Sequence, residues 1–398
     1  MARQETGTVR MGRLGAKETK RRIRCGIAAL FIFSLLACVP ARSVHFTKVE
    51  MGCEEEERLL LQRSEAEQRL IEEQRSVYED EQLEHYLTEL ARSLQPPEVL
   101  ARISFRVTVL RDRSADALSF PDGRIYLTTG MVAQLENEAQ LAILLTHEMT
   151  HCTHRHALRA LRHVKEGAVR RKGLSGAASA LSWQNALPSL ETYLDELESE
   201  ADTVALQLVV RAGYDGAEGG KLLEWQQRDL EEGDLDEVSR VTRYRELEKR
   251  KEFWHKLLDT RAEDAKPGIT GREAFLAHTH RVILDTACAD ETRGRFTLAQ
   301  REVERYLAIR PDDARAYCLL GEICRQRGLV GDRNKAKDCY TKAIDLRPSF
   351  PEPHRGIGLV YYKEGEKARA KNSFEAYLIF APDAPDKAYI QRYLSTCN

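Results

Sequence analysis

The last third of the chain repeats with a period close to 34 residues. Prolines stand at Pro311, Pro348 and Pro382, which are spaced 37 and 34 residues apart. Small and aromatic residues recur at matching offsets before each proline. They are Gly294, Ala299 and Tyr306; Tyr317, Leu320, Gly321, Ala336, Tyr340 and Ala343; and Gly358, Tyr361, Gly365, Ala370 and Phe374. A unit this short cannot bury its apolar face alone, so the copies must stack into a helical solenoid.

This register resembles the tetratricopeptide repeat, in which each copy is a helix-turn-helix pair. Unrelated helices that end at prolines would not place small and aromatic residues at the same offsets in three copies. The resemblance implies a C-terminal repeat domain over residues 279–398. Stacked repeats form a concave groove, so we expect a partner protein or a peptide to bind there.

A second pattern, near the middle of the chain, points to metal chemistry. Residues 146–151 read THEMTH and follow an apolar run at 141–145. His147 and His151 are four residues apart and therefore share one face of a helix. Two imidazoles at this spacing can bind zinc, with Glu148 acting as a general base. Because so short a motif also arises by chance, an exposed polar turn of helix is the alternative.

A catalytic zinc ion needs a third protein ligand and an open position for water. Residues 190–211 are predicted to form another helix, which contains Glu198, Glu200 and Asp202 in the run ESEADTVA. Glu198 and Asp202 share a face of that helix, whereas Glu200 points elsewhere. Taken alone, Glu198 is better explained as a solvated surface carboxylate.

Together, the HExxH motif and the later E-x-E-A-D-x-x-A run resemble the HtpX- and BepA-like metallopeptidases, peptidase family forty-eight of the gluzincins. The resemblance covers about residues 80–285. It implies one Zn²⁺ ion per chain, bound by His147, His151 and Glu198, with Glu148 as the catalytic residue. It also implies that Asp202 orients a ligand histidine from outside the metal's ligand set.

Residues 116–126 (DALSFPDGRIY) are similar to the family's N-A-F-x-x-P-G-G-x-I-[YF] strand pair, with Asp116 and Asp122 as departures. In that family the strand lies beside the zinc cleft and pairs with an extended substrate. The resemblance therefore implies a substrate strand, made of Ile125, Tyr126, Leu127 and Thr128.

Other histidines and one cysteine surround these motifs. The family carries a His-Pro element, for which His278 and His280 are the nearest candidates, although Arg281 follows His280. We keep His280 as a candidate accessory residue, with a surface histidine as the alternative. His156 is interpreted as a packing residue, and Cys152 as part of the core because it faces away from the ligands.

The amino terminus is typical of an export signal. Residues 1–25 hold eight Lys and Arg side chains against two Glu, and 26–37 form a twelve-residue uncharged, mostly apolar run. This length suits a signal peptide and is short for a membrane span. The run ends at Cys38 in a sequence that resembles a bacterial lipobox, which implies lipidation of Cys38. An ordinary cleaved signal or a signal anchor is the alternative, and Met11 is a second candidate start.

These features predict a mainly α protein with a small β-sheet, an α+β zincin-like peptidase domain followed by an α-solenoid of repeats. We assign residues 1–37 to a lipoprotein signal peptide, 38–79 to a linker and N-terminal helix, 80–278 to the peptidase domain and 279–398 to the repeats. A strand is expected at 103–110, a hairpin at 118–129 and one helical run at 137–164. Residues 54–94 should be helical, with a break near Ser76.

The predicted function is that of a zinc metalloendopeptidase of the bacterial cell envelope, with unfolded or misassembled proteins as substrates. Its predicted location is the periplasm, with a lipid anchor in the cell envelope. The outer membrane is the favoured site of this anchor, and the inner membrane is the alternative. The near balance of 61 basic and 63 acidic residues argues against a nucleic-acid clamp. The alternative is a repeat-based scaffold or chaperone with latent protease activity, although the intact Glu148 favours an enzyme.

Overall fold

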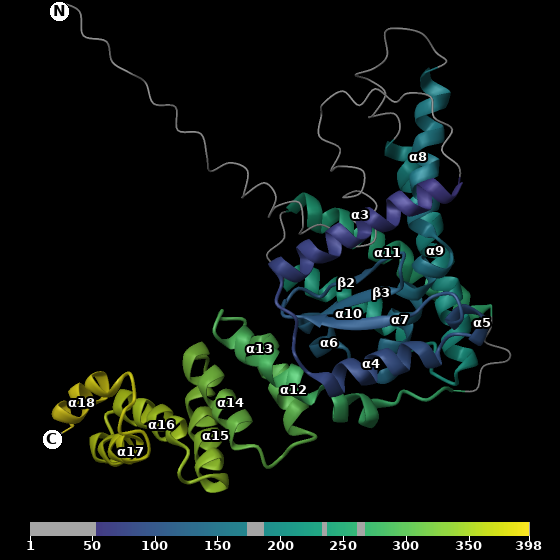
Figure 1. Cartoon of the computed structure of the whole chain (residues 1–398). Coiled ribbons are helices and arrows are strands. Elements are labelled where there is room, and N and C mark those ends of the chain that lie inside the picture. The colour runs from purple at the N-terminus through teal and green to yellow at the C-terminus, as the bar shows by residue number, and fades with distance from the viewer. Residues whose placement is uncertain (1–52, 173–186, 233–236, 261–266, 398) are drawn as a thin grey trace, which may run out of the picture.

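The computed structural model describes residues 53–172, 187–232, 237–260 and 267–397 (Figure 1). The predicted signal peptide and Cys38 lie outside these residues. The elements are α3 (Cys53–Gln74), α4 (Glu81–Ser93), α5 (Pro97–Leu100), β1 (Arg106–Leu110), β2 (Ala117–Ser119), β3 (Arg124–Thr128), α6 (Thr129–Gln134), α7 (Glu138–Thr153), α8 (His156–Lys172), α9 (Leu187–Arg211), α10 (Glu218–Glu232), α11 (Glu237–Asp259), α12 (Arg272–Glu291), α13 (Phe296–Leu307), α14 (Ala314–Arg327), α15 (Asp332–Leu346), α16 (Pro351–Lys363), α17 (Lys367–Phe380) and α18 (Lys387–Thr396). The expected fold class, helices with one small sheet and then helical repeats, is confirmed.

The sheet has three strands in the order β1-β3-β2. β3 runs parallel to β1, with Val107 opposite Ile125, and antiparallel to β2, with Leu118 opposite Tyr126. The β2–β3 turn contains Gly123, whose φ of +92° suits glycine, and an added Cβ there would come within 2.6 Å of Ile103. Glycine is therefore the residue that this tight turn accommodates.

Helices cover both faces of this sheet (Figure 1). On one face, Tyr126 packs with Leu110 and Phe120, and α3 closes this cluster through Ile71. The Tyr126 hydroxyl also donates a hydrogen bond to Glu72 of α3 at 2.6 Å. On the other face, Val107, Val109, Ile125 and Leu127 join a larger core with residues of α4, α6 and α7. The period-two alternation of the strands thus separates two cores.

The expected helical run at 137–164 is in fact two helices. α7 begins after Asn137, whose side chain caps the helix by accepting from the amide of Gln140. It ends at Thr153, and Arg155 then adopts a left-handed conformation with φ of 53° before α8 starts. This reversal lets α8 leave in a new direction. The sequence has no glycine at this turn, so hydrophobic periodicity alone predicted one continuous helix.

The C-terminal helices form three antiparallel pairs, α12/α13, α14/α15 and α16/α17, followed by α18 (Figure 1). The repeat residues explain the close packing: Tyr340 is fully buried between Gly321 and Gly356. A Cβ at Gly356 would lie 2.3 Å from the Tyr340 ring, so no larger residue fits without movement.

The repeats and the peptidase part share a continuous core. Val303 and Tyr306 of α13 belong to the same apolar cluster as Val282 of α12 and Met131 of α6. Arg305 of α13 donates to the carbonyl oxygens of Ala133, at 2.6 Å, and of Leu135. The expected boundary between residues 278 and 279 falls within α12, a helix that packs against α6 as well as α13.

Two further observations concern membranes and cysteines. In the described ranges, no helix combines the length and the apolar character that a bilayer span requires. Six cysteines of this part, Cys152, Cys288, Cys318, Cys324, Cys339 and Cys397, are all free thiols.

Candidate metal centre

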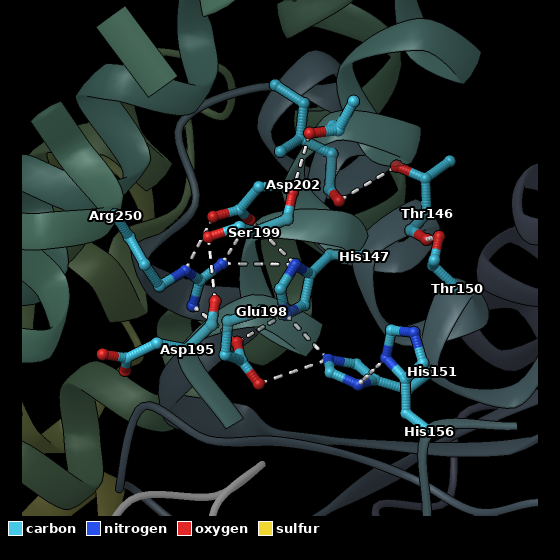
Figure 2. A network of polar contacts seen from close by, with 12 residues as sticks. Thr146, His147, Thr150, His151, His156, Asp195, Glu198, Ser199, Asp202 and Arg250 are labelled. Atoms are coloured by element: carbon cyan, nitrogen blue, oxygen red, sulfur yellow. Dashed lines mark hydrogen bonds and ion pairs between the residues drawn. The ribbon is translucent and has the colours of Figure 1, made fainter. Parts of the chain in front are cut away.

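Two helices bring the predicted ligands together (Figure 2). His147 and His151 project from α7, and Glu198 projects from α9, which packs along α7. The Nε2 atoms of the two histidines are 3.1 Å apart. Glu198 places Oε2 3.3 Å from Nε2 of His147, and Oε1 3.6 Å from Nε2 of His151. Three potential ligand atoms of the types that zinc prefers therefore converge on one point.

The spacing of these atoms fits a tetrahedral ion. Bonds of about 2.0–2.1 Å in tetrahedral geometry place neighbouring ligand atoms about 3.3–3.4 Å apart. The observed separations of 3.1, 3.3 and 3.6 Å bracket this value. This cluster is also the single group of three or more His, Cys, Asp or Glu side chains with metal-binding spacing that the described residues contain.

The ring of His147 is held from its far side. Its Nδ1 lies 2.9 Å from Oδ1 of Asp202, a buried carboxylate one helical turn after Glu198. A carboxylate only accepts hydrogen bonds, so Nδ1 carries a proton, and Nε2 is the nitrogen that can offer a lone pair to a cation once its own proton has left. Asp202 therefore lies where the sequence predicted an orienting residue.

Arg250 of α11 completes this arrangement, and the sequence reasoning missed it. Its guanidinium donates to both oxygens of Asp202, from Nη2 to Oδ1 at 2.6 Å and from Nε to Oδ2 at 2.9 Å. Nη1 also lies 3.6 Å from Oε2 of Glu198. The charged stretch 243–252 of α11 gives no local signal that distinguishes this arginine from the neighbouring basic residues.

The predicted general base, Glu148, is buried between α7 and the sheet. Ser119 of β2 donates a hydrogen bond from Oγ to its Oε2 at 2.6 Å, which leaves Oε1 to accept a proton. Burial raises the pKa of Glu148, and the charge of His147 and the Ser119 hydrogen bond act in the opposite direction. Ser119 was also missed, because it occupies a variable position of the strand pattern.

The environment of the cluster shifts the pKa values of its members in different directions. Burial lowers the pKa of His151 to about 4, so this ring is neutral at pH 7. Burial also opposes protonation of His147, but the hydrogen bonds to Asp202 and Glu198 outweigh it and raise its pKa to about 9. For Glu198, burial would raise the pKa, yet the two neighbouring histidines hold it well below its usual range. A cation at this point would meet one carboxylate and two imidazoles.

The predicted substrate strand is the central strand of the sheet and not an edge strand. β3, which contains Ile125, Tyr126, Leu127 and Thr128, is the central strand and is paired with β1 and β2 on its two sides. Its hydrogen-bonding groups are therefore occupied, and a substrate cannot pair with it. The prediction followed the hairpin, whereas the parallel partner β1 comes from a non-local contact that no hairpin pattern reveals.

Neither candidate accessory histidine reaches the cluster. His278 stacks on Tyr86 with ring centroids 4.1 Å apart. His280 donates from Nδ1 to the carbonyl oxygen of Ala277 at 2.8 Å, and it lies near Tyr306 and Arg310 at the junction with the repeats. Cys152 points its thiol at the carbonyl oxygen of Phe120, at 3.0 Å, as expected of a core residue.

A helix that carries HExxH beside a second helix that supplies a glutamate defines the His-His-Glu class of metal-dependent peptidase sites. The family comparison agrees with the geometry. The chain belongs to peptidase family M48, whose profile matches residues 78–282, 205 of the 398 residues. A tetratricopeptide repeat profile matches residues 284–332. The resemblances to the peptidase family and to the tetratricopeptide repeat are confirmed.

Several curated proteins are similar to part of the chain. The beta-barrel assembly-enhancing protease of Escherichia coli (strain K12) is 26% identical over 150 residues, which are 34% of this chain and 31% of that protein. A putative beta-barrel assembly-enhancing protease of Vibrio cholerae is 26% identical over 165 residues, 37% of this chain and 33% of that protein. The mitochondrial metalloendopeptidase OMA1 of Schizosaccharomyces pombe is 26% identical over 158 residues, 38% of this chain and 45% of that protein. The match thus spans about a third of the length of the bacterial relatives.

Proposed function

We propose that this chain is a zinc-dependent metalloendopeptidase that cleaves unfolded or misassembled proteins in the bacterial cell envelope. The observation that carries the proposal is the convergence of His147, His151 and Glu198 with Glu148 beside them. Membership of a peptidase family whose members depend on metal, typically zinc, supports the choice of ion.

In this proposal, the Nε2 atoms of His147 and His151 and the carboxylate of Glu198 hold the zinc ion. When bound, zinc would supply a Lewis acid that polarises the scissile carbonyl and acidifies a water molecule. Glu148 takes a proton from that water at Oε1 and delivers it to the leaving amine. Ser119 keeps the Glu148 carboxylate in place during this transfer, because it holds Oε2.

The structure suggests a different strand for substrate pairing. Phe120 donates to Arg124 and Thr128 donates to Asp116, so alternate residues of β2 face β3. The backbone groups of Ala117 and Ser119 consequently point to the outer edge of β2, which has no strand partner in the described part of the chain. Ser119 is also the residue that touches Glu148, so a peptide paired with this edge would pass beside the general base.

We also propose that residues 1–37 direct export and that Cys38 carries a lipid anchor, which would place the enzyme on the periplasmic side of a membrane. The support is the basic and apolar pattern of residues 1–38 and the names of the bacterial relatives, which refer to the assembly of β-barrels. The three repeat pairs would bind a partner protein or hold the substrate.

The alternative function, a scaffold, rests on the same repeats. One substitution can distinguish it from the enzyme. Glu148→Gln removes the base without changing its volume, and Glu196→Gln alters an exposed carboxylate on α9 as a matched control. We expect Glu148→Gln to lose casein cleavage by a factor of about 10²–10⁴ while it still binds zinc, and Glu196→Gln to remain active. Full complementation of a deletion strain by Glu148→Gln would favour the scaffold.

A further inference from the structure

The three carboxylates of the E-x-E-A-D run diverge in space. Glu198 faces the cluster and Asp202 holds His147, whereas Glu200 turns to the start of α8. There it lies beside His156, which in turn contacts His151 (Figure 2). We propose that His156 is a positioning residue that orients His151 for metal binding, with Glu200 selecting the tautomer of His156. This inference rests on the zinc site proposed above.

The contact between the two histidines restricts their tautomers. Nδ1 of His156 lies 3.0 Å from Nδ1 of His151, which is hydrogen-bond distance. For His151 to offer the lone pair of Nε2 to a metal, its single proton must be on Nδ1. That proton can then be donated only if Nδ1 of His156 is bare. His156 must therefore carry its own proton on Nε2.

Glu200 lies where it favours this tautomer. Its Oε2 is 3.7 Å from Nε2 of His156, longer than a hydrogen bond but close enough for a negative charge to stabilise an N–H there. Arg159 of α8 donates to the same oxygen at 2.8 Å and fixes the carboxylate in place. A chain of contacts thus runs from Arg159 through Glu200 and His156 to His151.

A role in packing alone does not explain the ring of His156. The side chain is only 1% exposed, and within the described residues its Nε2 has no partner at hydrogen-bond distance. Burying an unsatisfied polar nitrogen costs free energy that an apolar residue would avoid. Its Nδ1, by contrast, meets the one nitrogen of His151 that faces away from Glu198. The polar contact that His156 does make is therefore the one with His151, a proposed zinc ligand.

The two histidine ligands are consequently held by different chemistry. His147 donates to a carboxylate that is tied to an arginine. His151 donates to a neutral imidazole. Loss of an orienting partner of this kind typically weakens metal affinity by about 10–100-fold.

The test compares two substitutions of nearly equal shape, His156→Asn and His156→Leu. The amide oxygen of asparagine can replace Nδ1 as an acceptor, whereas leucine has none. We expect zinc affinity, measured by competition with a chromophoric chelator, to fall at least about tenfold further in His156→Leu than in His156→Asn. The visible absorption bands of the Co²⁺-loaded protein should broaden or shift in His156→Leu only.

Controls separate the ways in which this could fail. His156→Phe, a second variant without an acceptor, fills the ring volume and should bind zinc as weakly as His156→Leu. It replaces His156→Leu in the comparison if circular dichroism of the metal-free protein shows that His156→Leu folds poorly. His154→Asn changes the neighbouring histidine, which contacts Glu200 but not His151, and should bind zinc like the wild type. Equal affinities of the Asn, Leu and Phe variants would overturn this inference alone. Absence of zinc binding in the wild-type chain would overturn the proposed function and the inference with it.

Discussion

Arg250 donates two hydrogen bonds to Asp202, one to each carboxylate oxygen, at 2.6 and 2.9 Å. Asp202 in turn accepts from Nδ1 of His147. The guanidinium comes from α11, the carboxylate from α9 and the imidazole from α7, so three helices meet through one buried charge. Asp202 can stay ionised in this place because Arg250 offsets the cost of its burial.

Replacing Arg250 with methionine should destabilise the protein. The substitution leaves Asp202 buried without its cation, and removal of one partner from such a pair costs about 3 kcal/mol of unfolding free energy. We take the low end of the usual range because the Arg250 side chain is 25% exposed. Urea unfolding of the metal-free protein measures the loss. Adding Asp202→Asn should cost less than the sum of the two single changes, and strict additivity would contradict the coupling.

Ser119→Ala should shift the pH dependence of catalysis. The Ser119 hydrogen bond lowers the pKa of Glu148, so its removal raises that pKa. A base with a higher pKa is protonated at higher pH, and the acid limb of kcat/KM should move upward by about one pH unit. Zinc content should be unchanged. Ser119→Thr keeps the hydroxyl and serves as the control, and an unshifted acid limb in Ser119→Ala would argue against the contact.

Zinc affinity should increase with pH. The metal-free His147 has a pKa of about 9, raised from 6.5, so at pH 7 a proton must leave this ring before zinc binds. Affinity should rise about tenfold per pH unit from pH 7 and level off near pH 9. Stability of the metal-free fold has the opposite sign: the protonated ring contributes fully below about 6.5, and the contribution is lost as pH rises through 9. Calorimetry in buffers of different ionisation enthalpy counts the released proton, and a count of zero near pH 7 would refute the assignment.

Substrate pairing with β2 should appear as a period of two. An extended peptide presents every second amide to the strand beside it. In a series of peptide substrates with single N-methyl groups, kcat/KM should fall about tenfold at alternate positions near the cleaved bond and change little between them. Uniform losses along the series would show that the peptide binds without pairing to the Ala117 and Ser119 edge.

Local sequence spacing predicted the parts of the site that lie on single helices. His147 and His151 follow from the four-residue repeat of a helix, and Glu198 from the family pattern of the second helix. Arg250 could not be predicted, because its partner Asp202 is 48 residues away and the sequence of α11 contains many other Lys, Arg and Glu residues. Ser119 and Glu148 meet for a similar reason, since the approach of β2 to α7 depends on the tertiary fold.

The order of the strands in the sheet and the hydrogen-bond partner of His156 could not be predicted from the sequence either. The hairpin indicated that β2 and β3 pair, but the parallel contact between β1 and β3, which makes β3 central, is non-local. His156 looks like a packing residue in the sequence because a buried histidine and an orienting histidine have the same pattern. Only the 3.0 Å distance to His151 separates the two interpretations.

The helix α12 has a mechanical consequence. This helix packs in the peptidase core against α6 and α7, and it is also the first helix of the first repeat pair, where it packs against α13. The two parts therefore have no flexible linker between them. Under the proposed function, a protein bound to the repeats would be held in a fixed orientation relative to the metal site, because α12 belongs to both parts. Lengthening the loop between α12 and α13 would leave α12 intact, whereas cutting the chain at residue 278 would divide this helix. Under the same proposal, this helix would determine which part of a bound protein reaches the metal site.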